Sequence, residues 1–66
     1  MTLKDLRTSA GKTVKETAAA LGVSERTVYT YEDGTRTLNI AQVLILSEIY
    51  DSSERDVIEA ALNSRR

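Results

Sequence analysis

The 66-residue sequence contains no cysteine, histidine, proline, tryptophan or phenylalanine. Without cysteine the chain forms no disulfide and no thiolate metal site, and without histidine it lacks the commonest metal ligand and general base. No apolar run is long enough to span a bilayer, and no charged-then-apolar leader opens the chain. We therefore expect one small cytoplasmic domain over residues 1–66 that is neither an enzyme nor a membrane protein and that binds no metal or cofactor.

Charge is nearly balanced, with nine basic and ten acidic residues and a net charge of −1. The two parts of the chain differ, because residues 1–38 hold six basic and five acidic side chains whereas residues 39–66 hold three and five. This distribution predicts a modest positive face on an acidic body. Electrostatic attraction to a polyanion should then be limited, and non-specific binding weak at physiological salt.

The spacing of apolar residues and the absence of proline predict an all-α chain of five short helices with short connections. Residues that can cap helix starts precede four of them: Thr13, Ser24, Asn39 and Ser53. Two of these caps have the partner of a capping box three residues on, namely Glu16 and Gln42. We place the helices near residues 2–9, 13–21, 24–32, 39–50 and 53–64.

The apolar positions within these helices predict a small core. In the first helix Leu3 and Leu6 should face inward, and Leu38 should tuck into the core from the loop before the fourth helix. In the fourth helix, the inward face is expected to hold Ile40, Val43, Leu44, Ser47 and Tyr50.

Residues 13–34 form the most informative segment of the chain. Gly22 stands where the first of two helices must end with a positive φ, and Val23 can plug the turn. Inward positions fall at helical spacing: Val14, Ala18, Leu21, Val28 and Tyr31. Glu25, Arg26, Tyr29 and Thr30 are left facing outward on the second helix. This pattern predicts a helix-turn-helix at about 13–33, whose second helix is shaped to enter the major groove of DNA.

From about Leu3 to Val57 the chain resembles the phage repressor and Cro-like helix-turn-helix family, also called the xenobiotic-response-element type. The resemblance rests on Leu6-Arg7, on the turn from Ala20 to Ser24, on Tyr-Glu-Asp-Gly, on the apolar spacing of the fourth helix and on Val57. It implies a compact five-helix lambda-repressor-like fold. It also implies a transcriptional regulator, in most cases a repressor, that reads a palindromic double-stranded DNA operator as a homodimer without a small-molecule ligand.

The resemblance also implies roles for individual residues. The positions that read base edges correspond to Glu25, Arg26, Tyr29 and Thr30. The positions that contact the DNA backbone correspond to Lys12, Thr13, Lys15, Ser24, Thr35, Arg36 and Thr37. Arg7 and Glu32 match a structural ion pair between the first helix and the end of the recognition helix. Val14 stands where many relatives have a glutamine that touches phosphate, and valine cannot make that contact through its side chain.

Two questions stay open at this point. Ile45 and Ile49 either are covered by the last helix or join Ile58 and Leu62 in a dimer interface, with residues 53–64 as the dimerisation helix. The rival function is a protein-interaction module or antitoxin-type partner that keeps the fold with weak or no DNA binding. The acidic balance, Glu25 and Val14 favour that alternative, and a third possibility is a fragment of a longer regulator.

Overall fold

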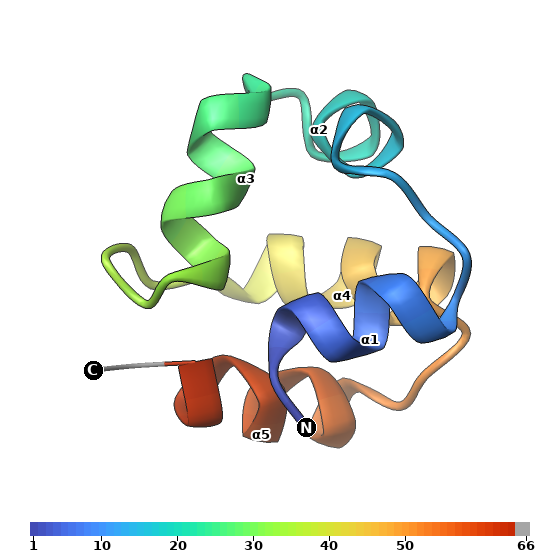
Figure 1. The fold of residues 1–66 in the computed structure, drawn as a ribbon. Coiled ribbons are helices and arrows are strands. Elements are labelled where there is room, and N and C mark those ends of the chain that lie inside the picture. Colours follow the sequence, from blue (N-terminus) through green and yellow to red (C-terminus); the bar gives the residue numbers. More distant parts are fainter. Residues whose placement is uncertain (65–66) are drawn as a thin grey trace.

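The computed structural model describes residues 1–64, which contain five α-helices and no β-strand. The helices are α1 (Leu3–Ser9), α2 (Val14–Leu21), α3 (Glu25–Glu32), α4 (Ile40–Ile49) and α5 (Glu54–Ser64). They confirm the predicted all-α fold and its helix order. Helices α2 and α3 lie together on one side, above the layer formed by α1, α4 and α5 (Figure 1). Within the described chain, no helix has the length and apolarity needed to cross a membrane.

Side chains that cap the helix starts set the positions of the elements. The two predicted capping boxes, Thr13 with Glu16 and Asn39 with Gln42, are both present. A third box, formed by Thr2 and Asp5 at the start of α1, was not predicted. Hydrogen bonds from backbone and hydroxyl groups of the capping threonines lower the pKa of Asp5 and of Glu16, because these bonds favour the charged carboxylates.

The buried residues form two clusters. The larger cluster joins α1, α3, α4 and α5 and contains Leu3, Leu6, Tyr31, Leu46, Tyr50, Val57 and Ala60, with Leu38 packed against it as predicted. The smaller cluster consists of Val14, Ala18 and Val28, with Val23 packed beside it. Because the smaller cluster lies between α2 and α3, the helix-turn-helix has an apolar contact of its own, and Tyr31 joins α3 to the main core.

The prediction for the inward face of α4 was wrong at two positions. Ile40 is 81% exposed and Leu44 is 44% exposed, whereas Leu46, which was not predicted, is only 3% exposed. Nine consecutive residues from Leu38 include seven apolar ones, so α4 presents apolar side chains on every side. Such a helix has no apolar stripe from which its buried face can be identified.

The first and last helices are tied together. The backbone N–H of Leu3 donates to Ser64 Oγ at 3.0 Å, and Asn63 Nδ2 donates to the carbonyl oxygen of Met1 at 3.0 Å. Ser64 Oγ also donates to the carbonyl oxygen of Ala60 at 2.8 Å. These bonds satisfy the first turn of α1 and hold it against α5, on the far side of the layer from α2.

Candidate nucleic-acid interface

The turn between α2 and α3 has the geometry that the sequence predicts. Gly22 has a φ of 71° and a left-handed conformation, and its N–H bonds back to carbonyl groups of α2. A residue with a side chain is strained in this backbone conformation, whereas glycine, which has no Cβ, is not. Ser24 then begins α3, because its Oγ accepts a hydrogen bond from the backbone N–H of Thr27 at 3.2 Å. The outer face of α3 is therefore fixed relative to α2.

Three predicted base-reading residues lie together on that outer face. Glu25, Arg26 and Tyr29 are exposed, while Val28 and Tyr31 on the opposite side of α3 are buried. Thr30 is half-buried, and its hydroxyl donates to the carbonyl oxygen of Thr27. Its methyl group is therefore the part of Thr30 that remains for contact with a ligand.

The predicted backbone-contacting residues flank this face at both ends. Most of them are exposed: Thr13, Lys15, Ser24, Thr35, Arg36 and Thr37; Lys12 is half-buried. The hydroxyl oxygens of Thr13 and Ser24 already accept from backbone N–H groups as helix caps. The other residues of this set have no capping role: Lys12, Lys15, Thr35, Arg36 and Thr37.

The loop after α3 is held close to the end of that helix. The backbone N–H groups of Thr35 and Arg36 both donate to the carbonyl oxygen of Thr30, at 3.0 and 3.1 Å. Asp33 Oδ1 also accepts from the N–H of Thr35 at 2.9 Å. These bonds fix the backbone of Arg36 beside the outer face of α3 and leave its side chain exposed.

Arg7 and Glu32 form the ion pair that the family resemblance implies. Arg7 Nε lies 2.6 Å from Glu32 Oε2, and Arg7 Nη1 donates to the carbonyl oxygen of Lys12 at 3.2 Å. The two side chains are only 11% and 9% exposed. The hydrogen bond to Glu32 raises the pKa of the Arg7 guanidinium. One side chain thus joins α1, the connection before α2 and the last residue of α3.

Two further polar contacts, which the sequence analysis missed, connect α4 with the helix-turn-helix. Thr17 Oγ1 and Tyr50 Oη lie 3.2 Å apart in the interior, and Thr17 also donates to the carbonyl oxygen of Thr13. Burial raises the pKa of Tyr50. Gln42 Nε2 donates to Tyr31 Oη at 2.8 Å. The signal for Thr17 was its position three residues after Val14 and one before Ala18, on the inward side of α2.

The four residues considered for a dimer interface do not share one environment. Ile58 and Leu62 on α5 are 48% and 57% exposed. Ile45 and Ile49 on α4 are half-buried, and Ile49 packs against the larger core cluster. On α4 the large exposed apolar side chains are instead those of Ile40 and Leu44.

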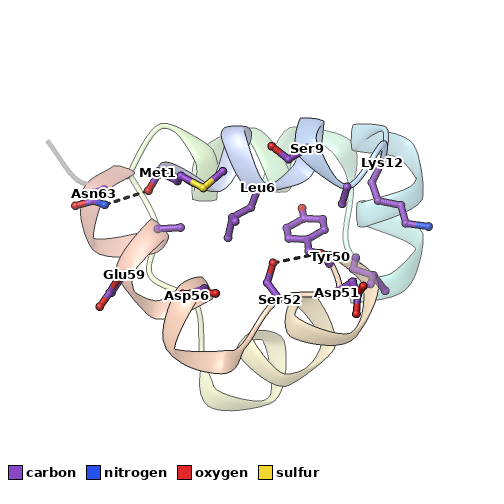
Figure 2. Close-up of a pocket in the computed structure, with 13 residues that line it drawn as sticks. Met1, Leu6, Ser9, Lys12, Tyr50, Asp51, Ser52, Asp56, Glu59 and Asn63 are labelled. Atoms are coloured by element: carbon purple, nitrogen blue, oxygen red, sulfur yellow. Dashed lines mark hydrogen bonds between the residues drawn. The ribbon is translucent and has the colours of Figure 1, made fainter.

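A hollow that is lined by α1, the turn after α4 and α5 lies away from α3 (Figure 2). It has a volume of about 770 Å³ and lies between the end of α1, the turn after α4, and α5. Leu6 and Tyr50 lie at its inner wall, while Asp51 and Asp56 lie at its edge. Residues 1–64 contain no group of three or more acidic side chains placed to hold a metal ion. None of its lining residues belongs to α2 or α3, so this hollow meets the candidate interface only at Lys12, in the connection before α2.

A family model described as a helix-turn-helix domain matches residues 1–61. The chain therefore belongs to the helix-turn-helix domain family, whose members are typically DNA-binding and non-enzymatic. The match does not distinguish the phage repressor and Cro-like type from other helix-turn-helix domains. No curated protein and no solved structure matches the chain.

Proposed function

We propose that this protein is a sequence-specific DNA-binding transcriptional regulator of the Cro and repressor type that acts in the cytoplasm as a repressor. The observation that carries this proposal is the outer face of α3, where Glu25, Arg26 and Tyr29 are exposed together while Val28 and Tyr31 hold the helix in place. A helix of this kind fits the major groove and presents its polar side chains to base edges.

The chemistry of each side chain suggests its role in the groove. Arg26 is suited to a bidentate contact with guanine, the commonest specific contact of arginine. Glu25 can accept a hydrogen bond from the amino group of cytosine or orient Arg26. Thr30 offers its methyl group to a thymine methyl, because its hydroxyl is bonded within α3. Tyr29 can stack on a base or bond to a phosphate.

The residues on either side of α3 would position the protein on the DNA backbone. Arg36, with Thr35 and Thr37, extends from the loop after α3, and Lys12 and Lys15 lie at the start of α2. Phosphate contacts of this kind fix register and orientation without reading sequence. Thr13 and Ser24 would contribute through the helix starts that they cap.

We further propose that the protein binds a palindromic operator as a homodimer through α5. Ile58 and Leu62 lie four residues apart and form an exposed apolar pair on one face of that helix. A two-fold dimer places two recognition helices roughly 34 Å apart, on successive major grooves. Repression would then be steric, because the bound dimer blocks polymerase.

The test is an unbiased selection of bound sites from random duplex DNA at two salt concentrations. An inverted repeat with half-sites about one helical turn apart is the expected result. Absence of enrichment at both salt concentrations would favour the alternative function, a protein-interaction module or antitoxin-type partner. Glu25 on the outer face of α3 is the structural feature that favours this alternative, because a carboxylate there repels a polyanion.

Replacing Arg26 with alanine is expected to weaken operator binding by about 1–3 kcal/mol and to relax specificity at one base pair. The side chain is exposed, so the fold should be retained. Binding isotherms on the selected operator and on single-base variants would measure both effects. An equal loss of affinity on every sequence would remove Arg26 from base reading.

Replacing Arg36 with alanine should weaken binding to all duplexes alike and make the salt dependence shallower by about one ion for each bound protomer. Arg55→Ala is the matched control, because Arg55 is an exposed arginine on α5 whose ion pair with Glu59 is also exposed. Affinities measured between 50 and 200 mM salt, roughly the range over which counterion release is pronounced, would give the slopes. An unchanged slope for Arg36→Ala would exclude a phosphate contact.

A further inference from the structure

A second hollow, of about 510 Å³, lies between α1 and α3 and is lined by Lys4, Arg7, Tyr29, Glu32 and Asp33. Tyr29 belongs to the outer face of α3 and is 55% exposed. Lys4 lies on α1 three residues before Arg7, so the two side chains are neighbours on one side of that helix. The hollow therefore extends the outer face of α3 onto α1, which lies outside the helix-turn-helix motif.

Two basic side chains line this hollow, Lys4 and Arg7, and of these two only Arg7 forms an ion pair within residues 1–64. Arg7 and Glu32 neutralise each other through bonds of 2.6 and 3.4 Å. One carboxylate oxygen of Asp33 accepts the N–H of Thr35 in the following loop. Over residues 1–64 the Lys4 side chain makes no ion pair shorter than 4.0 Å, and it is exposed. Of the six basic residues in the first 38, Lys4 alone has no role in the interface described above.

The dimensions of helix and groove decide what this hollow would meet. An α-helix with its side chains is about 10–12 Å across. The major groove is about 12 Å wide. A helix seated in the groove therefore brings its flanks against the two phosphate backbones and only its outermost residues against the bases. Tyr29 shares the hollow with Lys4, which places its ring on the flank of α3 that faces α1.

We propose that Lys4 and Tyr29 together bind one phosphate of the DNA backbone. Lys4 Nζ forms the ion pair, and Tyr29 Oη donates a hydrogen bond to the same phosphate group. The inference rests on the proposed DNA-binding function and deepens it. It makes α1 part of the interface, and it gives Tyr29 a positioning contact in place of a base contact.

The experiment uses the full chain and the operator duplex recovered by selection, with affinities measured by fluorescence anisotropy at several salt concentrations. Lys4→Ala should weaken binding about tenfold and make the slope of log affinity against log salt shallower by about 0.9 for each bound protomer, or about 1.8 for a dimer on both half-sites. Tyr29→Phe should weaken binding without changing the slope, since it removes a donor and no charge. In the double variant, affinity should fall by a smaller factor than the product of the two single-variant factors, because both groups contact one phosphate.

Three controls make the outcome specific. Lys4→Arg should keep the slope, and Arg55→Ala should also keep the slope although it removes the same charge. Site selection with Lys4→Ala should return the wild-type sequence. Wild-type slope and affinity for Lys4→Ala, or a changed base preference, would overturn the phosphate contact alone. Failure of the wild-type chain to bind any duplex would instead overturn the proposed function and this inference with it.

Discussion

Replacing Arg7 with alanine should lower the free energy of unfolding by about 3 kcal/mol, the cost of leaving a buried charge without its partner. Glu32 is 9% exposed, so its carboxylate cannot recover full hydration when the guanidinium is removed. The carbonyl oxygen of Lys12 loses its donor in the same variant. For a chain of this length each kcal/mol corresponds to roughly 4–8 °C in Tm, so thermal unfolding should show a fall of roughly 12–24 °C.

Substitution of Glu32, the partner of Arg7, provides a strict test of this prediction. Glu32→Gln keeps the shape of the side chain but removes its charge, and it should also destabilise the protein. The double variant Arg7→Ala, Glu32→Gln should be more stable than the sum of the two losses implies, because neither charge is then left alone. Arg55→Ala, which breaks an exposed ion pair, should change stability by at most about 1 kcal/mol. Strict additivity in the Arg7 and Glu32 cycle would contradict a coupled pair.

Loss of this ion pair should also weaken DNA binding through the proposed contact surface on α3. Arg7 joins α1 to the last residue of α3, and Tyr31 and Gln42 join the same end of α3 to α4. With one of these connections removed, the end of α3 is held by the core contacts of Tyr31 and by the Gln42 hydrogen bond. We expect folded Arg7→Ala, at a temperature below its transition, to bind the operator more weakly than the wild type.

The helix-turn-helix was predictable from the sequence because its signals are local. Gly22 has the positive φ that its position implies, and the caps at Thr13 and Ser24 lie within three residues of the N–H groups they satisfy. Outward and inward positions on α3 follow from helical periodicity, since Val28 and Tyr31 are apolar or aromatic among polar neighbours. Short-range chemistry of this kind does not depend on how the rest of the chain packs.

The orientation of α4 and the interior hydrogen bonds could not be predicted in the same way. Periodicity requires a contrast between apolar and polar positions, and α4 has little, so Leu46 was missed while Ile40 and Leu44 were placed inside. The bond between Thr17 and Tyr50 joins residues 33 positions apart. Such a contact exists only once the packing of α2 against α4 is known, so no sequence window reveals it.

Removal of the exposed apolar pair on α5 should disrupt the proposed dimer. Ile58→Gln combined with Leu62→Gln should make the protein monomeric and reduce affinity for a two-half-site operator at least about a hundredfold, because the second half-site is no longer bound intramolecularly. Both side chains are about half exposed, so the domain itself should stay folded. Analytical ultracentrifugation would measure the oligomeric state. Titration of duplexes with one or two half-sites would measure how much the second half-site adds to the affinity.

The chain offers a matched control for this prediction, because Ile40 and Leu44 are also exposed, apolar and four residues apart. Ile40→Gln with Leu44→Gln removes a similar pair from α4 and should leave a dimer that binds two half-sites. If the α4 variant becomes monomeric and the α5 variant stays dimeric, the interface lies on α4 and the assignment of Ile58 and Leu62 is wrong. If both variants keep the oligomeric state and the operator affinity of the wild type, neither apolar pair joins two copies. Because each substitution removes apolar surface without adding charge, a difference between the two variants reports the position of the interface and not electrostatic repulsion from DNA.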